Sequence, residues 1–495
     1  MKIRGRVFKG WLHIDLSSLS PSELSKIESI LVKTTKLIYF KPRWDDIENK
    51  VILEPVEKTV AYYDSNKGFF KARAGLTGYL RKILGRYDYK LLVEFNYECS
   101  PEKLSLENIK CGEPEKKLWL FDFQYDAYRK WYINSRTGTV AVPTGGGKTF
   151  IGLKAIYELK KPSLILVPTV ELIKQWQRFI REYLGYEAGG FHAREKELKP
   201  ITITTYNSVV KYKELFASYG FDILIADEVH HVPARTLMEA CLTIPAPYRL
   251  GLSATPRRSD RNEHLIYYLI GDVVYRAKPK FLVEQGLTVP IIHNVVVVPV
   301  ERRVKEELKR ITEKSLSKGI VWTLGYRGKL SAVRYIVKKH KQDKIIIFTQ
   351  YLDQAKRVYS LLYSMFREEI CLITSKTKPK EREKFFKEFE SGKKRVLVTT
   401  TCLDEGINVP DADVCIILSG LGERQMVQRV GRVCRKREGK DVAYVYEIIT
   451  DTPLEKSLSK RRDVLEDFFY IKKKRIIDFS KILQTSERYI RKIIP

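Results

Sequence analysis

The sequence predicts an α/β protein in which two parallel-sheet domains follow one another, with a small α+β domain before them and a helical extension after them. From residue 139 to residue 447 one unit recurs: an apolar run rich in β-branched residues, then a polar turn, then an amphipathic stretch of helical period. The runs fall into two groups, and a glycine-rich turn follows the first run. Alternation of this kind is typical of parallel sheets.

Each group of apolar runs accounts for one sheet. The first group predicts strands at 139–142, 163–167, 201–204, 223–226 and 249–252, and the second predicts strands at 344–349, 395–399, 414–418 and 443–447. We therefore expect one parallel-sheet domain at 118–300 and the other at 345–450, joined by a short basic insert and linker at 301–344.

The two ends of the chain have other patterns. Residues 1–112 contain one or two helical patterns and short stretches of alternating polarity at 2–7, 11–16 and 90–97, which predict the α+β domain. From 451 to 495 basic and apolar residues interleave, which predicts the helical extension.

The composition favours a nucleic-acid partner. The 495 residues include 90 Lys and Arg against 60 Asp and Glu, a net charge of +30, and 44% of them are hydrophobic. A folded chain with this excess of positive charge is expected to bind an acidic partner. Nucleic acid is the densest polyanion and is favoured, and an anionic membrane surface is the alternative. The stretch 301–344 alone holds 14 Lys and Arg against five acids. No apolar run approaches the roughly 20 residues of a membrane-spanning helix, so we expect no membrane partner.

The seven cysteines favour a reducing compartment. They are never closer than twelve positions apart and form no CxxC pair, which excludes zinc-ribbon and thioredoxin-like spacings. We expect free thiols in a cytoplasmic, nucleoid-associated protein.

A phosphate-binding loop follows the first predicted strand. Backbone N–H groups of a glycine turn can surround a phosphate, and the start of the next helix adds its positive dipole end. Lys148 would reach the outer phosphates of ATP, and the Thr149 hydroxyl would bind Mg²⁺. An ordinary glycine turn is the alternative, but strand, turn and helix occur in the required order. The loop comprises Pro143, Thr144, Gly145, Gly146, Gly147, Lys148 and Thr149, with Val142 in place of the usual first glycine.

Two carboxylates follow the fourth predicted strand. Asp227 and Glu228 lie where α/β sheets place their ligands. Asp227 would hold Mg²⁺ through water, and Glu228 would orient the attacking water. Alone, such a pair is usually a solvated turn, but the phosphate loop in the same domain favours catalysis. For His230 and His231 we expect structural or coupling roles, since no cysteine lies near them to complete a metal site.

Arginines recur at three-residue spacing near the end of the second domain. Arg429, Arg432 and Arg435 would share one face of a helix. Arg432 and Arg435 are the candidates for arginine fingers, which neutralise charge on the phosphoryl group during its transfer. The alternative is a basic helix that contacts solvent or a nucleic-acid backbone.

The order of these motifs between residue 118 and about residue 449 resembles that of superfamily 2 nucleic-acid helicases and translocases. Residues 167–169 resemble motif Ia of that superfamily, residues 404–410 resemble motif V, and residues 428–435 resemble motif VI. The resemblance implies two RecA-like domains, with ATP and Mg²⁺ as cofactors. It also assigns adenine reading to Gln124, ATP contact to Asp404 and Gly406, and coupling of hydrolysis to movement to Ser253, Thr255 and Gln428.

Within the superfamily the sequence resembles the XPB family of DNA repair helicases, in particular its archaeal members. The resemblance rests on 227–231, on the run 249–255, on 345–349, and on 403–407 followed by 410–412. It implies a damage-recognition-like domain at 1–112, a DNA-gripping thumb in the basic insert, and a nuclease partner in archaea. Ser259 departs from the Arg-Glu-Asp element of the family, and the basic insert is short for a thumb.

The expected function is an ATP-dependent DNA helicase or double-stranded DNA translocase, acting as a monomer in nucleotide excision repair or transcription. Contacts mainly to phosphates would make its binding tolerant of sequence and sensitive to salt. The predicted DNA contacts are Thr169, Thr205, Tyr206, Arg258, Asp260, Arg302, Arg303, Lys305, Lys309, Arg310 and Thr400.

Two other classes of function stay open. The chain could be a DNA-binding scaffold that recruits a nuclease, with ATP only switching its conformation. Phe468, Phe469 and Tyr470 offer docking material for such a partner, although packing of a terminal helix explains them equally well. The third possibility is an RNA helicase, because the Asp-Glu-x-His motif does not decide between RNA and DNA.

Overall fold

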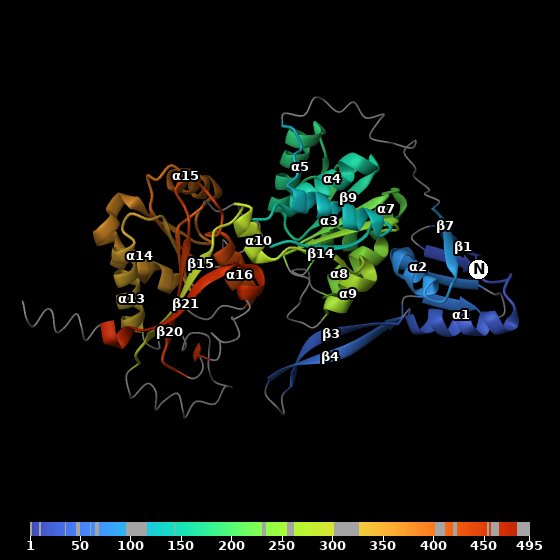
Figure 1. Ribbon diagram of the computed structural model, residues 1–495, viewed down its shortest axis with the longest axis horizontal. Helices are drawn as coiled ribbons and strands as arrows, with labels where there is room; N and C mark the ends of the chain where they lie inside the picture. Colours follow the sequence, from blue (N-terminus) through green and yellow to red (C-terminus); the bar gives the residue numbers. More distant parts are fainter. Residues whose placement is uncertain are drawn as a thin grey trace, which may run out of the picture. The chain divides into compact units, whose positions relative to one another are not determined.

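The chain forms two compact units in the computed structural model (Figure 1). One comprises Met1–Val142 and Gly147–Ala277, and the other comprises Pro143–Gly146 and Lys278–Pro495. The structure describes residues 2–8, 11–34, 36–45, 50–59, 61–64, 69–95, 116–143, 145–229, 234–254, 262–300, 326–400, 411–418, 423–452, 455–456 and 465–482.

The first unit begins with a mixed sheet and helices, which confirms the predicted α+β domain. Strand β1 pairs in parallel with β7 and antiparallel with β2, in a sheet of order β5-β6-β2-β1-β7. Residues of β2 alternate between buried and accessible, as expected for a sheet with one covered face. The elements are β1 (Lys2–Phe8), β2 (Trp11–Asp15), α1 (Pro21–Thr34), β5 (Ala61–Asp64), β6 (Phe69–Arg73), α2 (Thr77–Gly85) and β7 (Lys90–Phe95), with β3 (Lys36–Asp45) and β4 (Lys50–Thr59) pairing as a separate ribbon.

The α+β domain and the first parallel-sheet domain share one hydrophobic core. Buried side chains of α1 and α2 belong to the same cluster as those of α8 (Ala234–Thr243) and α9 (Glu263–Leu269). A Cβ at Gly75 would lie 2.3 Å from the carbonyl oxygen of Cys241, so the two backbones touch there. The guanidinium of Arg73 donates to the hydroxyl of Thr243 at 3.3 Å. These contacts make the two domains a single body.

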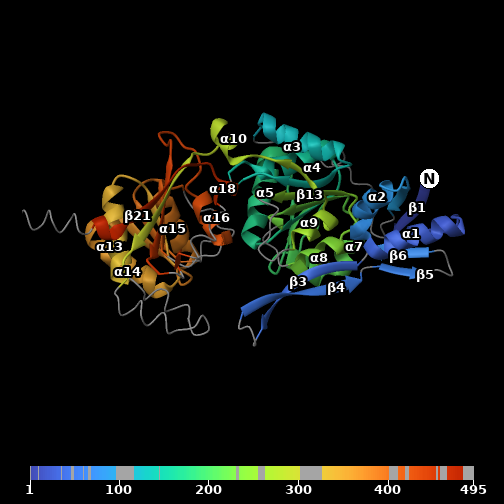
Figure 2. The ribbon, with the colours of Figure 1, turned by 60° about the horizontal axis from the view of Figure 1, so that its bottom comes forward.

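The first parallel sheet contains seven strands in the order β10-β11-β9-β12-β13-β8-β14. All residues of β9 and β12 are buried, which explains their uninterrupted apolar sequences. Helices α3 and α4 lie on one face of this sheet and α8 and α9 on the other (Figure 2). The elements not yet named are α3 (Asp122–Ile133), β8 (Thr137–Ala141), α4 (Lys148–Leu159), β9 (Ser163–Val167), α5 (Val170–Leu184), β10 (Gly189–Phe191), β11 (Ile201–Thr205), α6 (Tyr206–Lys211), α7 (Lys213–Ser218), β12 (Ile223–Asp227), β13 (Tyr248–Ser253) and β14 (Val273–Arg276).

The second unit is built around another seven-stranded parallel sheet, of order β17-β18-β16-β19-β20-β15-β21. The two sheets confirm the prediction of two parallel-sheet domains along the chain. The elements are α10 (Pro279–Glu284), β15 (Ile291–Val298), α13 (Tyr326–Lys339), β16 (Ile345–Phe348), α14 (Leu352–Phe366), β17 (Ile370–Ile373), α15 (Pro379–Glu390), β18 (Val396–Thr399), β19 (Val414–Leu418), α16 (Glu423–Gly431), β20 (Ala443–Thr450), α18 (Leu465–Phe468) and β21 (Ile471–Asp478).

Two features of this sheet differ from the prediction. Strand β15 lies between β20 and β21, so the second sheet begins before residue 300, where we expected the first domain to end. Strand β21 occupies part of the predicted helical extension, so that prediction is wrong for Ile471–Asp478. An edge strand with one neighbour can stay polar, and 472–476 are all exposed, so no apolar pattern marks this strand.

Candidate active site

The phosphate loop connects β8 to α4, as predicted. Gly147 directly precedes the helix and has a left-handed backbone, with φ of +71°. A Cβ at this position would lie 2.4 Å from Nε2 of Gln124. Both the backbone and the space therefore require glycine here. Gly145 also has positive φ, at +88°.

Gln124 lies beside the loop, in the first turn of α3. Its Oε1 accepts the backbone N–H of Phe121 at 3.0 Å, and its Nε2 donates to the carbonyl oxygen of Gly147 at 3.5 Å. The side chain therefore connects the start of α3 to the end of the phosphate loop. Adenine reading by Gln124 stays a prediction.

Lys148 and Glu228 face each other across the site. The Nζ atom of Lys148 lies 3.4 Å from Oε1 of Glu228, and both side chains are largely buried. Glu228 has φ of +49°, a strained conformation for a residue with a Cβ. In this backbone conformation the carboxylate lies within ion-pair distance of the lysine of the phosphate loop.

Asp227 is the last residue of β12, and 6% of it is exposed. Its Oδ2 accepts the indole N–H of Trp176 at 2.9 Å, and its Oδ1 accepts the backbone N–H of Glu228 at 2.9 Å. Burial, and after it the negative charge of Glu228, raise the pKa of Asp227, while the Trp176 hydrogen bond and the charge of Lys148 oppose this. A bound cation would remove the repulsion between the two carboxylates.

These residues fit the ATP and Mg²⁺ that the sequence predicts. A hydroxyl at Thr149 and a carboxylate at Asp227 are the hard oxygen donors that Mg²⁺ prefers. Lys148 supplies the positive charge for phosphate oxygens. Among the described residues there is no group of three or more His, Cys, Asp or Glu side chains that could form an all-protein metal site.

Ser253 ends β13, beside the strand that leads into the loop. Its carbonyl oxygen accepts the backbone N–H of Val142 at 2.9 Å. Ser253, which is predicted to couple hydrolysis to movement, is therefore hydrogen-bonded through its backbone to Val142, the residue before the phosphate loop. Its partner in the motif, Thr255, lies outside the described residues.

Two predicted DNA contacts are buried in the structure, and their contact with DNA stays a prediction. Tyr206 is 2% exposed, and its hydroxyl donates to the carbonyl oxygen of Asp227 at 2.9 Å, so the ring supports the active site from inside. Thr400 follows β18 and is also buried. Thr205 caps α6 by accepting the N–H of Ser208 at 3.2 Å and stays partly accessible. Thr169 directly precedes α5 at the carboxyl end of the sheet.

The predicted arrangement of the arginines in the second unit is wrong. Helix α16 ends at Gly431, so Arg432 and Arg435 follow the helix and do not share a face of it. Arg429 is fully buried, with its guanidinium 4.8 Å from the centre of the Phe348 ring. Its charge therefore packs against the domain core and does not face a nucleotide. A glycine at the last helical position can end the helix there.

The segment after α16 makes polar contacts with the residues that directly precede β19. Nζ of Lys440 donates to the carbonyl oxygens of Ala412 and Val433, each at 2.6 Å. Nη1 of Arg435 lies 3.5 Å from Oδ1 of Asp411. Sequence reasoning misses Lys440, because the charged residues Arg437, Glu438 and Asp441 around it carry no signal of burial.

Some predicted residues lie outside the described residues. These are Thr144, His230, His231, Thr255, Arg258, Asp260, Arg302, Arg303, Lys305, Lys309, Arg310, Asp404, Gly406 and the side chain of Gln428. Phe468 and Phe469 are described and are buried, so they do not offer the docking material that the scaffold alternative needs.

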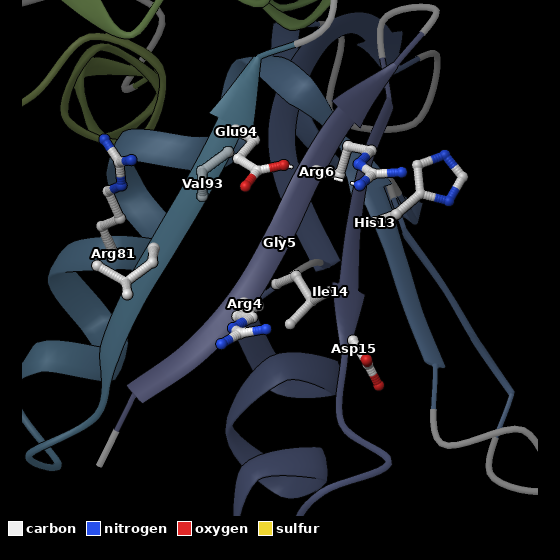
Figure 3. Close-up of a pocket in the computed structure, with 10 residues that line it drawn as sticks. Arg4, Gly5, Arg6, His13, Ile14, Asp15, Arg81, Val93 and Glu94 are labelled. Atoms are coloured by element: carbon white, nitrogen blue, oxygen red, sulfur yellow. Dashed lines mark ion pairs between the residues drawn. The ribbon is translucent and has the colours of Figure 1, made fainter.

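The outer face of the N-terminal sheet carries an open cleft of about 980 Å³. Arg4, Arg6 and His13 project from neighbouring strands on this face (Figure 3). Nη2 of Arg6 lies 3.7 Å from Oε2 of Glu94 across β1 and β7. The cleft is a second polar surface, apart from the phosphate loop.

Within the parts of the chain that the structure describes, no helix has both the length and the hydrophobicity needed to cross a bilayer.

Comparisons with known proteins identify the family of the chain. A family described as "Type III restriction enzyme, res subunit" matches residues 117–258, and "Helicase conserved C-terminal domain" matches 328–437. A solved structure of the ATP-dependent Type ISP restriction-modification enzyme LlaBIII bound to DNA has a similar fold, with a TM-score of 0.57 at 17% identity, covering 79% of this chain and 33% of that one.

Three curated relatives carry the same family name. The DNA 3'-5' translocase XPB2 of Sulfurisphaera tokodaii is 33% identical over 386 residues, which cover 70% of this chain and 85% of the relative. The DNA 3'-5' helicase XPB of Mycobacterium tuberculosis is 29% identical, over 66% of this chain and 60% of the relative. The XPB helicase/translocase subunit of general transcription and DNA repair factor IIH in Enterocytozoon bieneusi is 25% identical, over 95% of this chain and 81% of the relative. The chain, with its two RecA-like domains, belongs to the XPB family of helicases and translocases.

Proposed function

We propose that the protein is an ATP-dependent motor that moves along duplex DNA and opens it. The observation that carries the proposal is the arrangement of Lys148, Asp227 and Glu228 at the carboxyl ends of β8 and β12. The names of the XPB relatives support DNA as the substrate, and the net charge of +30 supports a polyanionic partner.

The three residues have separate roles in this proposal. Lys148 neutralises the outer phosphates of ATP and in doing so gives up its contact with Glu228. Glu228, released from the lysine, orients the attacking water and accepts its proton. Asp227 and the Thr149 hydroxyl would hold Mg²⁺, which supplies positive charge to the phosphate oxygens when it is bound.

Arg432 is the stronger of the two arginine-finger candidates. Arg435 lies near Asp411, whereas Arg432 follows α16 directly, in a segment that Lys440 holds through Val433. Arg432 is only 8% exposed, so its guanidinium would have to turn outward to reach a nucleotide. A guanidinium supplied by the second RecA-like domain would complete the charge around the phosphoryl group only when the domains close. Hydrolysis and product release would then open them and move the DNA.

The decisive test is ATP hydrolysis with duplex DNA, single-stranded DNA or RNA added. We expect the largest stimulation with DNA, and Lys148→Ala should abolish it. Lys154→Ala is the matched control, because Lys154 lies on the same helix and pairs with Glu158 on the surface. If RNA stimulates best, the RNA-helicase alternative holds; if Lys148→Ala keeps DNA opening at the wild-type level, the ATP-switched scaffold holds.

Strand displacement and triplex displacement separate unwinding from translocation along intact duplex. A motor that only translocates would remove a third strand and leave the duplex paired. Light scattering measures the molar mass and so checks the predicted monomer. Co-purification checks for a nuclease partner, and it is carried out with the wild type and with Arg432→Ala.

The N-terminal domain is a candidate second DNA contact, as its damage-recognition-like character suggests. Arg4 and Arg6 on the open sheet face support contact with phosphates. Replacing both by glutamine should lower the salt dependence of DNA binding, while basal ATP hydrolysis stays unchanged.

A further inference from the structure

The indole of Trp176 makes a buried contact that the proposed mechanism does not use. Trp176 lies on α5 and is 1% exposed, and its N–H donates to Oδ2 of Asp227 at 2.9 Å. A buried indole N–H needs some acceptor, and a backbone carbonyl usually serves. Here the acceptor is the carboxylate that the mechanism assigns to Mg²⁺.

The ring has little freedom to move. A Cβ at Gly152 would lie 2.7 Å from Cη2 of Trp176, so the indole packs directly on the backbone of α4, the helix that begins with Lys148. Nearby, the Phe150 ring of α4 lies 5.9 Å from Phe179 and 5.1 Å from Tyr183 of α5. These rings hold α5 against the phosphate-loop helix and keep the indole N–H in place.

The Asp227 carboxylate is held at both oxygens. The backbone N–H of Glu228 occupies Oδ1 at 2.9 Å, but it is attached to the same strand end and moves with it. Of these two hydrogen bonds, the one from Trp176 comes from another element of the sheet domain. The rotation of the carboxylate about its Cβ–Cγ bond is therefore set from α5.

We propose that Trp176 is a positioning residue for the metal-binding carboxylate of Asp227, and this inference rests on the proposed function. A carboxylate that is already oriented binds a metal with less loss of freedom than one that rotates. A hydrogen bond to a charged group is strong enough for its loss to weaken metal binding by about tenfold. If Trp176 only fills the core, its loss lowers stability and leaves metal binding alone.

The test compares two tryptophans that are equally buried and whose indole N–H groups have different acceptors. Trp131 is also fully buried in the first unit, and its N–H donates to the backbone carbonyl of Arg249 at 2.8 Å. Trp176→Phe and Trp131→Phe each remove one indole N–H and keep an aromatic ring. For wild type and both variants, the affinity for ADP is measured by calorimetry with Mg²⁺ and with EDTA.

The readout for each protein is the ratio of its ADP affinity with Mg²⁺ to its ADP affinity with EDTA. This ratio reports the contribution of the metal alone, and unfolded protein in the sample does not change it. We expect Trp176→Phe to lower this ratio by about tenfold and Trp131→Phe to leave it at the wild-type value. A wild-type ratio in Trp176→Phe, or an equal fall in both variants, would overturn the proposal. If Trp176→Phe does not fold, Gly152→Ala is used, because its Cβ displaces the indole and removes no polar group. An unchanged ratio in folded Gly152→Ala would overturn the proposal equally. If the ADP affinity of the wild type does not depend on Mg²⁺, the inference is overturned, while the proposed function is tested separately by DNA-stimulated ATP hydrolysis.

Discussion

Replacing Arg249 by methionine is expected to destabilise the first unit by roughly 3 kcal/mol. Arg249 lies on β13 and is 2% exposed. Its guanidinium donates to the carbonyl oxygens of Ala246 at 3.2 Å, Cys241 at 3.1 Å and Leu269 at 2.7 Å, and also to that of Ile244. The arginine thus caps the carboxyl ends of two helices at once.

The magnitude follows from these four acceptors. Methionine has a similar length and no donor, so each carbonyl loses a partner at a cost of about 1 kcal/mol. The unfavourable burial of the charge disappears at the same time, which returns part of the roughly 4 kcal/mol. A loss of roughly 3 kcal/mol should lower the melting temperature of a domain this large by about 6 to 12 °C.

Differential scanning calorimetry measures the effect, with Arg81→Met as the control. Arg81 is partly buried and makes one such bond, from Nε to the carbonyl oxygen of Leu91 at 3.3 Å. It should lose about 1 kcal/mol. The reasoning is refuted if Arg249→Met melts within a degree of the wild type, or if both variants lose the same stability.

Three further predictions follow from local geometry. Gly147→Ala should weaken ADP binding, because its Cβ would lie 2.4 Å from Gln124 Nε2. Gly286→Ala has a similar φ of +68° and open space, so equal effects on ADP affinity would contradict this explanation. Lys329→Met should lower the free energy of unfolding of the second unit by roughly 3 to 5 kcal/mol in urea, because it removes the cation 2.7 Å from the buried Glu455 carboxylate. Adding Glu455→Gln to this variant should restore part of the lost stability. If stability does not recover, the loss is not an effect of the unpaired charge. Burial raises the pKa of the four thiols of Cys241, Cys371, Cys415 and Cys434. Ellman's reagent should therefore react with them only after unfolding, and a fast reaction in the native protein would disprove their burial.

The sheets were predictable wherever a strand is buried on both faces. Strands β9, β12 and β19 are buried at every residue, so their sequences are continuous apolar runs. The phosphate loop was predictable as well, because its chemistry lies in consecutive residues. Motifs of this kind need no information from distant parts of the chain.

Pairing between distant segments was not predictable in this way. The apolar run of β15 suits either sheet, and only its contacts with β20 and β21 assign it to the second. Tyr206 follows a strand end, where nucleic-acid contacts are expected, yet its ring points into the core. The roles of Trp176 and Lys440 depend on partners far away in sequence, so no local pattern could reveal them.

The position of β15 in the second sheet has a consequence during synthesis of the chain. Both of its neighbours, β20 and β21, are made long after it. Until then a strand rich in valine and isoleucine has two unpaired edges, which is a template for association with other nascent chains. A polypeptide that stops before Ile471 would keep one of these edges open, and we expect it to depend on chaperones or to aggregate.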